Sequence, residues 1–381
     1  MVLDDRLWRG PAPWVIVFLV VANLLAAWSG GALSMERDKN LLASREPADV
    51  SGTAPAPRFD RSVGEDTTAY LRHIPGGPVE STVILSGMSQ MYAINEARPG
   101  DQTISEWMDD VIAPAGIRVF GMAAPNLHNQ EALLLLLASI AEAPRRPAAF
   151  VYGVCFDKFR NVDLRPGYER LLRESPKLLA LWRSTCAEHG ETYPRACRKM
   201  AESPLAAEQA TESSEGVENH LRILTGQAFP IVAERTRLNA VLQERAFLFR
   251  NWLLRITPTS KRPVLESRYV LNQEFLGLLA DVARSHGVLL ALYVIPLNPR
   301  AENPYIVGQY ARFKTWLEAF AGERGAPFAN LEGEVPTEAW GQFMGGPDFK
   351  HFKGEGHERT ARAVLREFGP ALESSARAQA P

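Results

Sequence analysis

The stretch "STVILSGMSQMY", Ser81–Tyr92, decides how the chain folds. Its first half is apolar and rich in β-branched residues, and it predicts a buried strand that ends at Gly87. Glycine permits a tight turn, and Ser89 follows two residues later. A hydroxyl just beyond a strand end lies where open α/β sheets hold their sites. Serine also occurs often in turns and helix caps, so this stretch alone leaves both interpretations open.

Four more strand-like runs follow, and helical patterns separate most of them. The runs end at Ala123, Phe156, Asn298 and Gly333, and the helical patterns cover 103–112, 130–143, 272–286, 305–324 and 357–367. Apolar strands that alternate with helices are typical of a parallel sheet covered on both faces. We therefore predict a doubly wound α/β domain with five parallel strands over residues 66–375.

The interval between the third and fourth strands, 160–272, is too long for a simple crossover connection. It contains two extended helical patterns and an acidic, Ser- and Ala-rich piece between them. We interpret the interval as a mostly helical insertion into the α/β domain.

The amino-terminal run "WVIVFLVVANLLAAW", Trp14–Trp28, is apolar except for Asn23. With the small residues behind it, the run approaches the about 20 residues that a membrane-spanning helix needs. We expect residues 1–35 to form a cytoplasmic tip and a membrane anchor, and residues 36–65 to form a tether. Arg6 and Arg9 precede the run and favour a domain outside the cytoplasm, on the periplasmic side. A cleaved signal peptide and a buried helix of a soluble domain are the alternatives.

The charge balance argues against a nucleic-acid-binding protein, and the spacing of the cysteines argues against a metal site. The 42 Lys and Arg residues nearly balance the 44 Asp and Glu residues, so no field exists to hold a nucleic acid. Cys186 and Cys197 bracket a short turn-like segment and are a possible disulfide. Together with His189 they give only three ligands at an unfamiliar spacing, so we expect no metal site. We interpret Cys155, which lies in a strand-like run, as a small buried apolar residue.

A second set of chemistry-bearing residues lies near the carboxyl terminus, in "GGPDFKHFKGEGHERTARAV", Gly345–Val364. Asp348 stands three residues before His351. A histidine that acts as a general base needs a carboxylate on its other nitrogen, and we expect one turn of chain to supply it. A surface aspartate beside a packing histidine is the alternative. His357, in the following helical pattern, is interpreted as a surface or packing residue.

Three short blocks in this order resemble the SGNH or GDSL hydrolase superfamily, whose sheet is of flavodoxin type. They are Gly87-x-Ser89, "FGMA" at 120–123 and "DFKHF" at 348–352. With the predicted anchor, the chain resembles the membrane-tethered branch typified by DltD and the alginate acetylation proteins. The resemblance implies that Ser89 is the nucleophile, His351 the general base and Asp348 its orienting carboxylate. It also implies that the backbone amides of Ser89 and Gly121 form an oxyanion hole.

Two positions depart from the superfamily pattern. Met88 replaces the aspartate of the GDS form, and the third block, Gly-x-Asn-Asp, is missing from "VYGVCFDKFRN", Val151–Asn161. Asp157 or Asn161 is a candidate for the missing contact, and an ion-paired aspartate and a helix-capping asparagine are the alternatives.

The resemblance implies an extracytoplasmic O-acyltransferase without a cofactor, which acts on an envelope polysaccharide beside a membrane-bound O-acyltransferase. A stand-alone periplasmic carbohydrate esterase and a non-catalytic scaffold that binds glycan remain alternatives.

Overall fold

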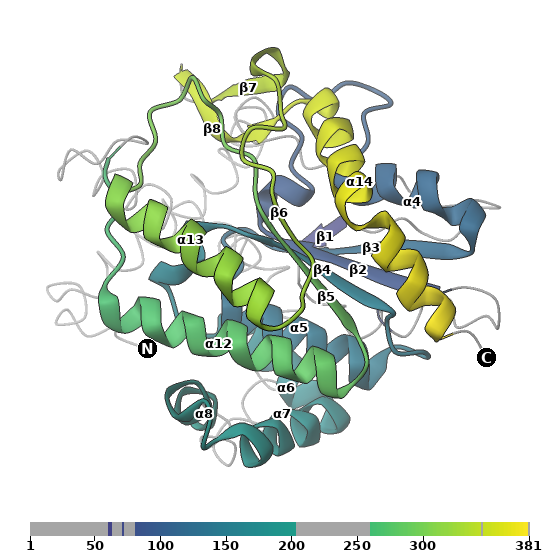
Figure 1. Ribbon diagram of the computed structural model, residues 1–381, viewed down its shortest axis with the longest axis vertical. Helices are drawn as coiled ribbons and strands as arrows, with labels where there is room; N and C mark the ends of the chain where they lie inside the picture. The colour runs from purple at the N-terminus through teal and green to yellow at the C-terminus, as the bar shows by residue number, and fades with distance from the viewer. Residues whose placement is uncertain (1–59, 63–70, 72–80, 203–259, 344–345, 380–381) are drawn as a thin grey trace, which may run out of the picture. The chain divides into compact units, whose positions relative to one another are not determined.

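Six parallel strands form the central sheet of the computed structural model (Figure 1). Their order across the sheet is β1-β3-β2-β4-β5-β6, so β2 lies between β3 and β4. The strands are β1 (Asp60–Ser62), β2 (Ser81–Gly87), β3 (Ile117–Ala123), β4 (Ala149–Val154), β5 (Leu289–Val294) and β6 (Phe328–Asn330). The five predicted strands are confirmed as β2 to β6. The sixth, β1, lies within the segment that we expected to be a plain tether.

The structure describes residues 60–62, 71, 81–202, 260–343 and 346–379. All of them belong to one of two compact units of the chain, residues 42–205 with 259–381. The predicted anchor in residues 1–35 lies outside the described residues, as does the middle of the predicted insertion. Among the helices that are described, none has the length and apolar character needed to cross a bilayer.

The middle strands are buried along their whole length. Every residue of β4 is buried, and six of the seven residues of β2 are buried as well. Such uniform burial requires cover on both faces, which explains why these strands read as continuous apolar runs rather than as alternating patterns.

Helices cover both faces of the sheet (Figure 1). On one face α4 packs against α14, and on the other α5 packs against α12, with α13 beside α12. Their bounds are α4 (Ile104–Ile112), α5 (Asn129–Glu142), α12 (Glu266–Ser285), α13 (Val307–Glu323) and α14 (Gly354–Ala378). The prediction of an α/β domain with both faces covered is therefore confirmed, and α14 extends well beyond the helical pattern seen in the sequence.

The described part of the insertion is helical. It contains α6 (Pro166–Glu174), α7 (Pro176–His189) and α8 (Pro194–Ala201). Because α7 packs on α5 and α8 packs on α12, these helices add an outer layer to that face of the domain.

The predicted disulfide between Cys186 and Cys197 is not formed. Both residues are free thiols, and they lie in two helices, Cys186 in α7 and Cys197 in α8, rather than in a hairpin. The Cys186 Sγ atom faces the backbone oxygen of Cys197 at 3.7 Å and the Met200 Sδ atom at 3.4 Å.

A two-stranded antiparallel hairpin, β7 (Trp340–Phe343) and β8 (Gly346–Phe352), precedes α14. It was not predicted. Asp348 and His351 therefore lie on a strand rather than on the turn that we expected.

Candidate active site

Ser89 lies immediately beyond the carboxyl end of β2. It begins a single 3-10 turn, Ser89–Met91, that follows the strand with only Met88 between them. The turn folds back tightly, since a Cβ atom on Gly87 would lie 2.7 Å from the Met91 Cγ atom. A side chain at position 87 would therefore require Met91, the last residue of the turn, to shift.

The Ser89 hydroxyl meets the His351 imidazole, although 262 residues separate the two in sequence. The Ser89 Oγ atom lies 2.8 Å from the His351 Nε2 atom. On the other side of the ring, the His351 Nδ1 atom lies 3.0 Å from Oδ2 and 3.2 Å from Oδ1 of Asp348. Because Nδ1 faces a carboxylate, the proton belongs on Nδ1, and Nε2 is free to accept from the serine. The structure therefore brings the three predicted residues together.

The Asp348 carboxylate is held by several donors. Its Oδ1 atom accepts from the backbone amides of Lys350 at 2.9 Å and His351 at 3.0 Å. Its Oδ2 atom accepts from the Asn95 side chain at 3.0 Å. Burial raises the pKa of Asp348, but the hydrogen bonds from His351 and from these two amides lower it more, so the pKa lies below its ordinary value. The carboxylate stays charged, as orientation of an imidazole requires.

Gln90 joins the turn that carries the serine to the strand that carries the histidine. Its buried Nε2 atom donates to the Lys350 carbonyl at 2.7 Å and to the Pro296 carbonyl, beyond β5, at 2.9 Å. Asn298, in the same segment beyond β5 as Pro296, donates from its Nδ2 atom to the Asp348 carbonyl at 2.7 Å. These bonds fix β8 against the carboxyl ends of β2 and β5.

Gly121 is not at the site. It lies inside β3, opposite Leu85 of β2 on one side and Asp60 of β1 on the other, and the strand continues to Ala123. Its amide is thus in the body of the sheet rather than at the carboxyl edge, which contradicts the prediction of an oxyanion donor at this position. The chain leaves the sheet beyond Ala123 and turns at Asn126, whose φ of 50° lies in the left-handed region.

Asp157 and Asn161 follow β4, where the third block of the superfamily is missing. Asp157 is buried and forms ion pairs with Lys350 and, at 3.2 Å, with Arg262. The side chain of Asn161 is exposed, while its carbonyl accepts from Asn272 at 3.1 Å. The ion-paired alternative is therefore the one observed for Asp157. Cys155, next to them, is buried and pairs with the Tyr305 hydroxyl at 3.2 Å.

His357 is fully buried, so the packing interpretation holds and the surface interpretation does not. Its ring lies edge-on to Phe352, and its Nε2 atom lies 3.3 Å from the Ala93 carbonyl, just after the Ser89 turn. Burial lowers the pKa of His357 to about 3, so the ring is neutral.

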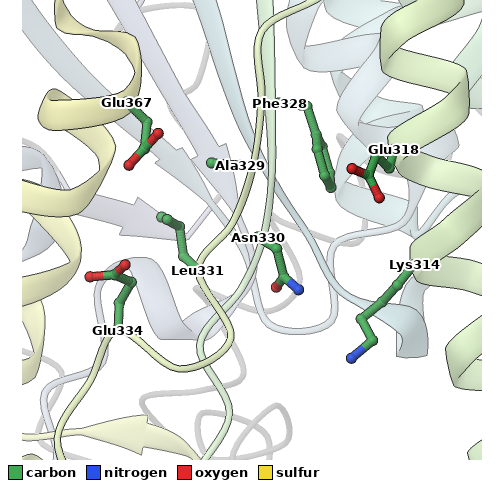
Figure 2. A pocket seen from close by; sticks show the side chains of 8 residues that line it. All are labelled: Lys314, Glu318, Phe328, Ala329, Asn330, Leu331, Glu334 and Glu367. Atoms are coloured by element: carbon green, nitrogen blue, oxygen red, sulfur yellow. The ribbon is translucent and has the colours of Figure 1, made fainter.

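A cavity of about 420 Å³ lies beside β6 (Figure 2), and none of the residues that line it belongs to the triad. Its charged residues include Lys314, which pairs with Glu332, and Glu334, which pairs with Arg366. Within the described residues, no three His, Cys, Asp or Glu side chains are grouped so that they could hold a metal ion.

Sequence reasoning missed the residues that hold the site together: Gln90, Asn95, Asn298 and Lys350. All four are buried polar side chains whose partners lie far away in sequence. The signal that could have found them is their position just after a strand or within the carboxy-terminal block.

Comparison with known proteins gives no family assignment. No family model matches the sequence, and no curated protein matches it. Two solved structures are similar over 81% of this chain and 94% of their own chains, each at 11% sequence identity. One is a protein assigned as an acylhydrolase from Bacteroides fragilis, with a TM-score of 0.38, and the other is a GDSL-like lipase from Bacteroides thetaiotaomicron, with a TM-score of 0.36. Because both TM-scores are low, we draw neither the family nor the activity of this chain from these similarities.

Proposed function

We propose that the chain is a serine acyl-ester enzyme of the SGNH type, with Ser89, His351 and Asp348 as its catalytic residues. The observation that carries this proposal is the 2.8 Å contact between Ser89 Oγ and His351 Nε2, with the Asp348 carboxylate on the opposite ring nitrogen. In this arrangement a carboxylate orients a histidine, and the histidine activates a serine. Several unrelated folds use it for acyl transfer.

The proposed reaction has two halves. His351 takes the proton from Ser89 as its oxygen attacks the ester carbonyl, and a tetrahedral intermediate forms and then expels the alcohol, which takes up that proton. An acyl-enzyme on Ser89 remains. An incoming hydroxyl group gives its proton to His351 and attacks the acyl carbon. The bond between that carbon and Ser89 Oγ then breaks, the acyl group stays on the incoming oxygen, and His351 returns the proton to Ser89 Oγ. When the hydroxyl group belongs to water the outcome is hydrolysis, and when it belongs to a sugar the outcome is transfer.

The Ser89 backbone amide is the proposed donor to the oxyanion. Ser89 is the first residue of its 3-10 turn, where amides have no acceptor within the helix. One such donor contributes about 3–4 kcal/mol to transition-state stabilisation in a serine protease. Gly121 is not proposed as a second donor, given its place in the sheet.

Transfer to an envelope polysaccharide is the finer part of the proposal. It rests on the resemblance of the Ser, Gly and Asp-x-x-His blocks to the membrane-tethered branch, and on the apolar amino-terminal run that favours an anchor. A membrane-bound O-acyltransferase is the proposed partner and source of acyl groups, with the domain on the periplasmic side.

A test with full-length protein in detergent separates this proposal from its alternatives. Wild type should hydrolyse p-nitrophenyl acetate, and Ser89→Ala should reduce kcat at least about a thousandfold, as loss of a triad member does elsewhere. Added polysaccharide should then divert acetyl groups from water to the polymer. Hydrolysis without any transfer would favour a stand-alone esterase, and glycan binding without Ser89-dependent turnover would favour a scaffold.

A further inference from the structure

We propose that Cys186, Cys197 and Met200 form a binding site for a soft monovalent cation, Cu(I). These three residues, which we call the sulfur cluster, lie between α7 and α8, in the outer layer that packs on α5 and α12. None of them belongs to the proposed triad, so the inference goes beyond the proposed function and does not depend on it.

Two thiols and a thioether gather between the two helices. The Cys186 Sγ atom lies 3.4 Å from the Met200 Sδ atom and 3.7 Å from the Cys197 backbone oxygen. The side chains of Cys186 and Cys197 also hydrogen-bond to each other, and both residues are free thiols. Since Cys197 and Met200 are three residues apart on α8, they face the same side of that helix. The cluster therefore presents three sulfur ligands to one position.

Contacts outside the cluster hold the two helices in register. One turn before Cys186 on α7, the Trp182 Nε1 atom donates to the Met200 carbonyl at 3.4 Å. The amino end of α8 is tied to α12, because the Glu274 carboxylate accepts from two backbone amides in the first turn of α8 at 2.8 and 2.9 Å. The fold thus positions the sulfur atoms, as a preformed metal site requires.

Cys186 gives an ion a path into the cluster. Its side chain is half-buried, whereas Cys197 is 7% exposed and Met200 is 2% exposed. An ion from the solvent therefore reaches the Cys186 thiol first and then the two residues behind it. Burial raises the pKa of both thiols, so both carry their protons before an ion binds.

Binding exchanges two protons for one ion. Both S–H bonds break, each sulfur keeps its electron pair, and the two protons pass to the solvent. Two bonds from copper to thiolate and one bond from copper to thioether form. Copper stays in the +1 state throughout, so the step needs neither an oxidant nor a reductant.

The ligand types select Cu(I) rather than zinc. Thiolate and thioether sulfur are soft ligands and suit Cu(I). A structural zinc ion takes four ligands from Cys, His, Asp and Glu. His189, which the sequence offers as a third ligand, packs its ring near that of Tyr193, and within the described residues it does not complete a group of metal ligands with the two thiols. The thioether of Met200 takes the place of the imidazole.

The experiment titrates reduced full-length protein in detergent with Cu(I), in competition with the chelator bathocuproine disulfonate. We expect wild type to bind one Cu(I) per chain. Cys186→Ser should weaken binding by more than the about 10–100-fold that loss of an outer contact costs at metal sites. Met200→Leu conserves side-chain volume and removes only the thioether, so it should weaken binding about tenfold. Cys155→Ser is the matched control, because Cys155 lies elsewhere and pairs with the Tyr305 hydroxyl.

Thermal unfolding gives a second readout that needs no chelator. An ion that binds only the folded chain raises Tm, so Cu(I) should raise the Tm of wild type and of Cys155→Ser but not that of Cys186→Ser. Wild type that retains no Cu(I) would overturn the proposal, as would wild-type affinity in Cys186→Ser or Met200→Leu. A disulfide between Cys186 and Cys197 would overturn it as well. Ellman's reagent, applied to denatured protein purified without reductant, would then detect one free thiol instead of three.

Discussion

The Asn95 side chain donates a hydrogen bond of 3.0 Å to the Oδ2 atom of Asp348. The same oxygen lies 3.0 Å from the His351 Nδ1 atom. Asn95 is buried and also donates to the Gln342 carbonyl at 3.1 Å. Asn95→Ala removes a hydrogen bond to a charged acceptor, which contributes about 1.5–3 kcal/mol. We expect the free energy of unfolding, measured in urea, to fall by that amount and kcat for ester hydrolysis to fall with it. An unchanged urea midpoint together with an unchanged kcat would show that Asn95 does not support Asp348.

Gly341 on β7 controls the position of Asn95. A Cβ atom at position 341 would lie 2.1 Å from the Asn95 Cγ atom, so Gly341→Ala must displace that side chain. We expect Gly341→Ala to reduce stability and kcat as Asn95→Ala does, and the double variant to lose little more. Gly333→Ala is the matched control, because its Cβ would meet no atom within 4 Å. Additive losses in the double variant would show that Gly341 acts independently of Asn95.

The middle strands of the sheet could be predicted because burial on both faces makes them continuous apolar runs. Val83 to Leu85 and Phe150 to Tyr152 have no exposed surface, and such runs are visible in sequence without knowledge of their neighbours. The β7–β8 hairpin could not be predicted, because β8 alternates buried and partly buried residues over a few positions and contains Pro347 and two charged side chains. Short alternating segments of this kind read as loops.

The residues of the site also divide into those that the sequence could predict and those that it could not. Ser89, Asp348 and His351 could be proposed because their residue types and order form a pattern. Gly121 was misplaced because the resemblance put its amide at the pocket, whereas Gly121 lies two residues before the end of β3, which ends at Ala123 as predicted. Gln90 and Asn298 act through backbone carbonyls of distant segments, and no sequence pattern specifies such partners.

Asp348 gives stability a defined pH dependence. Its pKa is below that of an ordinary aspartate, about 3.9, so unfolded chains bind this proton more readily than folded ones. The stabilisation that ionised Asp348 provides is fully present above about pH 3.9, and it is lost as the pH falls through the pKa of Asp348 in the folded chain. We expect the difference in free energy of unfolding between wild type and Asp348→Asn to be constant from about pH 7 to 5 and to shrink below about pH 4. A difference that does not depend on pH would contradict this assignment.

Lys158 gives a pH dependence of the same sign in a higher pH range. It is buried, its Nζ atom donates to the Gly153 carbonyl at 2.6 Å, and burial lowers its pKa from 10.5 to about 7. Between these values the unfolded chain binds more protons than the folded chain, so stability rises with pH. We expect wild type to gain stability relative to Lys158→Met as the pH is raised from about 7 to 10. Urea unfolding at several pH values checks this, and a constant difference would mean that Lys158 keeps an ordinary pKa.

The most direct measurement of the central claim is covalent labelling with a fluorophosphonate, followed by peptide mass spectrometry. If Ser89 is a nucleophile activated by His351, wild type forms one adduct on the peptide that contains Ser89. Ser89→Ala forms none, and His351→Gln reacts far more slowly. Absence of an adduct on wild-type Ser89, or equal labelling of all three proteins, would contradict the account.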